Sequence, residues 1–105
     1  MAKERKSFST CGNKGFQIQF PNKVVLSTQF GGGNYCENYD DPIEAHPNDK
    51  TSNNAEIAVF AGDGEWITKE IVEAATGEIL NDDVMGRVRV EDWLKILKAC
   101  ENFHR

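Results

Sequence analysis

The feature that most constrains the fold is an alternation of apolar and polar side chains along residues 15–20. A period of two is typical of a half-buried strand, so the apolar side chains from Phe16 to Phe20 are expected to share one face. The proline and asparagine of 21–23 predict a tight turn, because proline fixes φ and asparagine tolerates the left-handed region. The β-rich run 24–30 then completes a hairpin, with its apolar face opposite that of the first strand.

A helical stripe closes the chain. Its apolar side chains recur at spacings of three and four, which predicts a helix of about twelve residues. They are Trp93, Ile96, Leu97, Cys100 and Phe103. A helix with one apolar face needs a partner surface, so we expect this stripe to pack on the hairpin face that carries Phe16, Ile18 and Phe20.

The segment between these two elements contains shorter candidates. Residues 56–61 are apolar on both faces, which predicts an inner strand, and 66–68 begin a fourth one. Residues 69–80 fit either a short helix ending at Gly77 or the turn of a second hairpin, and we favour strand and turn. Residues 84–89 alternate as a short edge strand.

Together these elements predict an α+β fold. We expect a small antiparallel sheet of four to five strands, with an N-terminal hairpin and one C-terminal helix packed on it. A chain of 105 residues with 39% hydrophobic side chains fits a single core, which we assign to residues 14–105. Residues 1–13 are polar and are expected to form a flexible tail.

The compartment is inferred from what the sequence lacks. No apolar run approaches the roughly 20 residues of a membrane span, and no hydrophobic segment follows the basic N-terminus as in a secretory signal. The cysteines, Cys11, Cys36 and Cys100, are odd in number and widely spaced, unlike a disulfide framework. We therefore expect free thiols and a cytoplasmic protein without a membrane partner.

Charge is unevenly distributed along the chain. The net charge is −5, but residues 1–36 hold five bases and one acid, whereas residues 37–83 hold two bases and thirteen acids. Residues 84–105 return to a small positive charge. An acidic middle repels phosphate backbones, so direct nucleic-acid binding is not expected. It is typical of a solvated surface, or alternatively of a face that docks on a basic partner.

The most informative segment is the long irregular stretch 31–54, because loops of this length are uncommon unless they are functional or disordered. It opens with Gly31-Gly32-Gly33, whose successive N–H groups could cup an anion; the alternative is a simple turn. It is neither a P-loop nor a dinucleotide-binding fingerprint, because the Gly-Lys-Ser/Thr ending and the following helix are absent.

Four polar side chains follow the glycines. They are Asn34, Tyr35, Asn38 and Tyr39. Amides and phenols make adaptable contacts at interfaces, although the tyrosines could equally cap a sheet edge and the asparagines form local turns. We take residues 31–39 as the candidate binding site, with the Asn and Tyr side chains pointing outward and residues 40–54 mobile.

No catalytic or metal site is expected. Cys36 and His46 are ten residues apart, and nothing in the sequence brings them within hydrogen-bond reach. The loop also holds oxygen and nitrogen ligand types, but their spacing does not match a calcium loop. They are Asp40, Asp41, Glu44, His46 and Asp49. We therefore assign no catalytic residue, no metal and no cofactor.

Three stretches, 15–20, 29–38 and 54–60, resemble small uncharacterised proteins encoded by bacteriophages. In those proteins an aromatic hairpin precedes a glycine-rich Asn-Tyr-Cys loop, an Ala-Glu-Ile-Ala strand and a closing helix. The resemblance implies the cytoplasm of an infected bacterium. It carries no known activity, so no functional residue is transferred from it.

Two functions remain open at this point. The first is a non-catalytic binding module, a phage-type accessory or inhibitor protein that engages a host protein. The alternative is a small-ligand protein that holds a nucleotide or another anion at the glycine-rich loop. The first is favoured by the acidic middle, by the adaptable polar loop and by the lack of a catalytic constellation.

Overall fold

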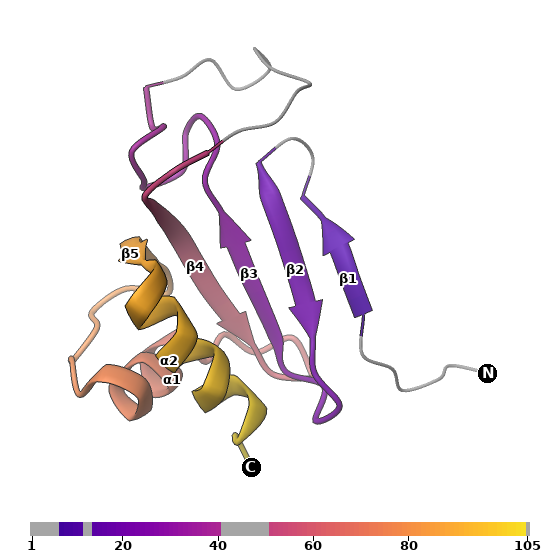
Figure 1. The fold of residues 1–105 in the computed structure, drawn as a ribbon. Coiled ribbons are helices and arrows are strands. Elements are labelled where there is room, and N and C mark those ends of the chain that lie inside the picture. The colour runs from indigo at the N-terminus through magenta and orange to yellow at the C-terminus, as the bar shows by residue number, and fades with distance from the viewer. Residues whose placement is uncertain (1–6, 12–13, 41–50, 105) are drawn as a thin grey trace.

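The computed structural model describes residues 7–11, 14–40 and 51–104. Within them a five-stranded antiparallel sheet has its strands side by side in sequence order (Figure 1). The strands are β1 Ser7–Thr10, β2 Gly15–Gln19, β3 Val25–Gln29, β4 Asn54–Phe60 and β5 Met85–Arg89, and the helices are α1 Thr68–Thr76 and α2 Val90–Glu101. The predicted α+β class, with an antiparallel sheet and a C-terminal helix, is confirmed.

The N-terminal hairpin has the predicted register. Phe16 lies opposite Thr28 and Ile18 opposite Leu26, so the apolar side chains of β2 and β3 share one face. The turn differs in detail, because the residue with positive φ is Lys23 (φ 71°). Asn22 contributes through its side chain instead, because its Oδ1 accepts a hydrogen bond from the Val24 N–H at 3.1 Å.

The strand and turn that we favoured for residues 69–80 are not what the structure shows. This segment forms helix α1 rather than a strand and turn, and Gly77 ends the helix in the left-handed conformation (φ 80°) with its N–H bonded to the Glu73 carbonyl. The predicted strand at 66–68 is also wrong, since only Trp66 makes an isolated bridge, to Phe60. Thr68 already belongs to α1, and its hydroxyl accepts a hydrogen bond from the Val59 N–H at 2.9 Å.

The core lies between one face of the sheet and the two helices. Ile96 and Cys100 of α2 are completely buried there, together with Leu26 and Ile57 of the sheet. The predicted docking of the C-terminal stripe on the hairpin face is confirmed. Trp93 meets the Phe16 ring edge to face, with centroids 6.4 Å apart, and its Nε1–H donates to the Thr28 hydroxyl at 2.8 Å.

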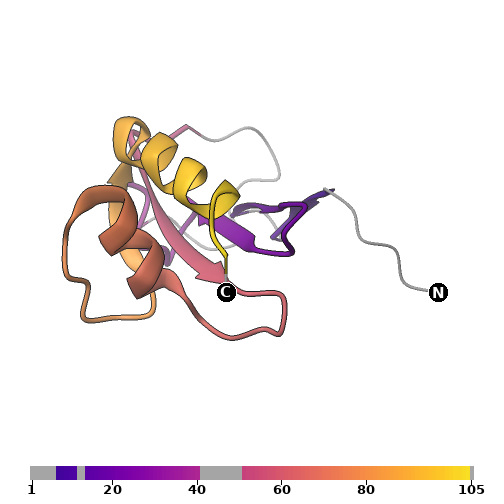
Figure 2. The ribbon, with the colours of Figure 1, turned by 90° about the horizontal axis from the view of Figure 1, so that it is seen from below.

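The helices cover only part of this face. Both lie over the side of the sheet formed by β3, β4 and β5, whereas β1 and β2 extend beyond them (Figures 1 and 2). The expectation that residues 1–13 form a flexible tail is wrong for Ser7–Thr10, because these residues form a strand that pairs with β2. Residues 1–6 and 12–13 lie outside the described part of the chain.

Two further findings concern thiols and membranes. All three cysteines are free, as predicted. In the described ranges, neither helix has the length and apolarity that a membrane span requires.

Candidate functional site

The glycine-rich loop is held together by the amide of Asn34, which points inward. Its Oδ1 accepts the Gly31 N–H at 3.0 Å, and its Nδ2 donates to Gln29 Oε1 and Glu56 Oε1, both at 3.1 Å. Asn34 is buried, as are Gly31 and Gly32. The expectation that this side chain points outward is therefore wrong, because it turns toward the half-buried side chains of Gln29 on β3 and Glu56 on β4.

The same loop uses the N–H groups that an anion would need. Gly31 donates to Asn34 Oδ1, Gly33 donates to the Tyr39 carbonyl at 3.0 Å, and Asn34 donates to the Gly31 carbonyl at 3.2 Å. The carboxylate of Glu56 also lies next to the Asn34 amide. A phosphate would thus compete with existing bonds beside a negative charge, so this geometry does not favour anion binding.

Asn38 is also a structural residue. Its Nδ2 donates to the Phe30 carbonyl at 2.7 Å and to the Thr51 carbonyl at 3.1 Å. Glu37 adds a second link, because its carboxylate accepts the Asn53 N–H at 2.8 Å. These bonds join the start of the long connection to the segment that leads into β4, so the described part of 40–54 is not a free loop.

Only the tyrosines of the predicted site present large side chains to solvent. The rings of Tyr35 and Tyr39 stack with centroids 5.6 Å apart and planes 6° from parallel, and they are 50% and 44% exposed. The Tyr35 carbonyl accepts the Arg87 N–H at 2.8 Å. Gly86 makes this approach possible, because a Cβ there would lie 2.6 Å from Tyr35 Cβ. The main chain of the tyrosine pair is therefore fastened to β5 through Tyr35.

The structure adds nothing in favour of catalysis at Cys36. The thiol is buried and its Sγ contacts the Gly31 carbonyl at 3.7 Å, while His46 lies outside the described residues. Asp41, Glu44 and Asp49 lie outside them too. Among the residues that are described, no three Cys, His, Asp or Glu side chains gather as a metal site would require.

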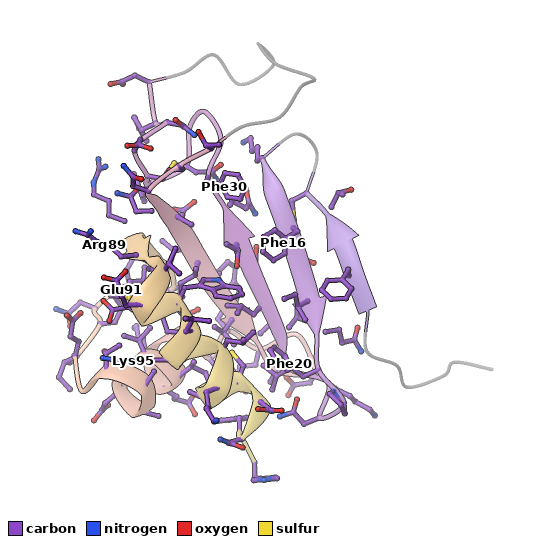
Figure 3. All side chains as sticks on the ribbon, viewed as in Figure 1. Phe16, Phe20, Phe30, Arg89, Glu91 and Lys95 are labelled. Carbon is purple, nitrogen blue, oxygen red and sulfur yellow. The ribbon has the colours of Figure 1, made fainter. Side chains whose placement is uncertain are left out.

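A larger feature lies beside α2, on the side away from α1. It is an apolar groove of about 420 Å³, located between the N-terminal turn of α2 and the ends of β2 and β3. It is lined by Phe16, Thr28, Phe30, Thr51, Ser52, Asn53, Asn54, Ala55, Val88, Val90 and Trp93. Figure 3 shows Phe16 and Phe30 on the sheet beside α2.

The groove continues into a wider apolar surface, which we call the open flank. It consists of the exposed Phe8 and the half-buried Phe16 and Ile18 on the helix-side face of β1 and β2, of Val90, which lines the groove, and of Leu94 one helical turn after it. Phe8 lies directly opposite Ile18 and is 82% exposed, and Leu94, one turn after Val90, is 53% exposed. Large exposed apolar side chains that gather in one region are uncommon on monomeric proteins, so we take the open flank as the candidate site.

The open flank is free of carboxylates along its strands. Residues 7–30 contain two lysines, Lys14 and Lys23, and no acid, in a chain whose net charge is −5. The acidic middle lies elsewhere in the sequence. A partner that covers the strands of the open flank therefore does not have to bury a carboxylate, whereas a partner that docks on the acidic stretch would have to bury several.

The sequence contained two signals for the open flank. Phe8 is an aromatic residue within the segment assigned to a tail, and its strand is defined only by pairing with β2. Val90 and Leu94 are spaced four apart, which widens the apolar stripe of α2 beyond what one contact face needs.

No protein-family model, no curated protein and no solved structure matches this chain.

Proposed function

We propose that this protein is a non-catalytic binding module whose open flank receives an amphipathic helix of a partner protein. The observation that carries the proposal is the uncovered, apolar part of the sheet beside α2, with Phe8 82% exposed. A large aromatic side chain contributes about 150–250 Å² of contact area, so Phe8 is a strong candidate anchor for binding.

The dimensions of the surface favour a helix as the docking element. Two adjacent strands span about 10 Å, which is close to the diameter of one α-helix. Helices α1 and α2 already cover the rest of this face, so one more helix beside α2 would complete the layer. Val90 and Leu94 would form one wall of its site, and the sheet would form the floor.

The helix fits the groove chemically as well. The surface of the groove is mainly apolar, and its polar groups come from Thr28 on the sheet and from residues 51–54. An apolar side chain of the partner helix would fill this space and displace water from Phe16 and Trp93. A host protein as the partner follows from the resemblance to phage-encoded proteins, which would make this chain an accessory or inhibitor protein.

A small apolar ligand is a second candidate, because the groove volume of about 420 Å³ lies within the usual range of about 300–1,000 Å³ for small-molecule sites. It replaces the anion at the glycine-rich loop as the favoured small-ligand hypothesis, since the N–H groups of Gly31, Gly33 and Asn34 already have partners. Such a ligand would change Trp93 fluorescence without engaging Phe8.

The test is affinity capture from bacterial lysate, with identification of the bound protein and a direct titration of it. Leu94→Asp and Phe8→Asp should each weaken the titrated affinity at least tenfold, because an exposed apolar contact is replaced by a charge. The matched control is Ile79→Asp, since Ile79 is 71% exposed but lies on the loop after α1. It should bind as the parent protein does.

Circular dichroism and thermal melting establish that all three variants fold. If Leu94→Asp and Phe8→Asp bind like the Ile79 control, the open flank is not the docking surface. If capture instead depends on Tyr35 and Tyr39, the site moves to the tyrosine pair.

A further inference from the structure

The two outer strands of the sheet are protected very differently. On β5 a bulge interrupts the pairing with β4, Arg87 has positive φ (54°), and its N–H is occupied by the Tyr35 carbonyl. Bulges and charged side chains such as Arg87 and Arg89 are the usual means of blocking an edge. Strand β1, Ser-Phe-Ser-Thr, has no charge, no proline and an uninterrupted register.

The direction in which the main-chain N–H and C=O groups of β1 point follows from the hydrogen bond that Cys11 makes directly after the strand. The Cys11 N–H donates to the Gly15 carbonyl at 2.9 Å. In an antiparallel pair the bonded positions alternate, so Ser9 turns its N–H and C=O toward β2, opposite Gln17. Phe8 and Thr10 therefore direct theirs to the outer edge. Within the described chain no strand lies on that side of β1.

We propose that this edge is a self-association site, where β1 pairs antiparallel with β1 of a second copy of the chain. The register is centred on Ser9, so that Phe8 lies opposite the partner's Thr10 and Thr10 lies opposite the partner's Phe8. Each of these two pairs exchanges both of its main-chain hydrogen bonds. The pairing joins the two sheets into one of ten strands.

The chemistry of β1 favours a second copy over an unrelated strand. Self-pairing places Phe8 against the methyl group of the partner's Thr10 and brings the two Phe8 rings into the diagonal positions that aromatic side chains can span. The strand is uncharged, so the directly opposed positions include no like-charge pair. Residues 7–30 contain no acid, which keeps the carboxylates responsible for the net charge of −5 out of the paired strands.

The symmetry of the pairing has a consequence for the docking surface. The two-fold axis of an antiparallel pair is perpendicular to the sheet, so the helices of both copies lie on the same side. The uncovered strands of the two copies then adjoin and form a floor four strands wide between two α2 helices. This inference goes beyond the proposed function, because β1 pairing uses the strand edge whereas helix docking uses the face.

The first test is sedimentation velocity at increasing protein concentration. Pairing of four-residue strands buries much less than ~1,000 Å², so we expect a reversible dimer that forms between roughly 10 µM and roughly 1 mM. Thr10→Pro removes an outward N–H without taking a bond from the β1–β2 ladder, and should weaken dimerisation at least tenfold. Thr10→Val, which keeps the N–H, should dimerise like the parent chain.

A parent chain that stays monomeric throughout this range overturns the proposal. So does a dimer that persists undiminished in a folded Thr10→Pro variant, since it would use another surface.

Cross-linking tests the register and does not depend on the proline variant folding. In the proposed register Ser9 faces the partner's Ser9 as a non-hydrogen-bonded pair, with Cα atoms about 4.5 Å apart, which is within reach of a disulfide. Ser9→Cys should therefore form a covalent dimer under copper-phenanthroline oxidation. Gln17→Cys lies on the same face one strand further in, so two copies of it would be too far apart to link. Equal cross-linking of both variants, or none with Ser9→Cys, contradicts the register.

Discussion

Asn34 provides the sharpest test of whether the glycine-rich loop is structure or site. The perturbation is Asn34→Ala, which removes one acceptor and two donors. The buried N–H of Gly31 is left without a partner, at a cost of about 1–3 kcal/mol. Gln29 and Glu56 are half-buried and can turn to water, so each contributes less, about 0.5 kcal/mol. The free energy of unfolding should fall by about 2–4 kcal/mol.

The assay is urea unfolding of the variant, with Asn81→Ala as the matched control, because Asn81 is exposed in the loop after α1. A surface substitution of that kind changes stability by less than about 0.5 kcal/mol. Should Asn34→Ala fall within the same small range, its three hydrogen bonds do not hold the loop. The amide would then be available to a ligand, as the sequence alone suggested, and the structural interpretation of the loop would be refuted.

Three further predictions concern the core and the end of α2. Ile96→Ala should lower the free energy of unfolding by about 2–5 kcal/mol, because Ile96 is completely buried; a loss below about 1 kcal/mol would show that α2 is not docked. Asn22→Ala should cost about 1–2 kcal/mol in the same urea assay, since its Nδ2 donates to the Cys100 carbonyl at 2.9 Å and to the Phe103 carbonyl at 3.0 Å; no change would mean that the turn does not cap α2. Burial raises the pKa of the Cys100 thiol from 9.0 to about 12, so the folded state keeps a proton that the unfolded state loses. The stability that comes from the buried neutral thiol is fully present below pH 9. As the pH rises from 9 toward 12, the free energy of unfolding should fall by on the order of 4 kcal/mol. Urea unfolding of Cys100→Ala should lack this part of the pH dependence.

The elements that could be predicted from sequence are those whose pattern is local and complete. The hairpin shows a period of two on both strands, and α2 repeats its apolar residues over three turns. Helix α1 has nine residues and a Gly77 that fits a hairpin turn as well as a helix end. Its conformation depends on packing against α2 and on the bond between Thr68 and Val59, neither of which a local pattern contains.

The structure of the glycine-rich loop could not be predicted correctly because it, too, depends on contacts between residues far apart in the sequence. Asn34 turns inward because Glu56, 22 residues away, lies within hydrogen-bond distance of its amide. Strand β1 is a tetrapeptide with a single apolar residue, Phe8, and its β conformation comes from pairing with β2. The tyrosines were correctly expected to be exposed, since phenols beside a tight turn with few apolar neighbours remain at the surface. The conformations of Asn34 and of β1 depend on contacts between segments that are distant in the sequence.

The position of the open flank follows from the order of elements in the chain. Helix α1 follows β4, and α2 begins at Val90, directly after β5, so both helices are connected to the strands at the β5 end of the strand order. A helix of twelve residues is about 18 Å long and covers about two strands, which leaves no helix over β1 and the outer part of β2. Connectivity therefore explains why β1 and β2 are uncovered, but it does not explain why they are apolar there. Exposed apolar side chains such as Phe8 and Leu94 promote aggregation unless they have a partner. Their retention beside an unprotected strand edge is the physical reason for placing the binding function on this side of the molecule.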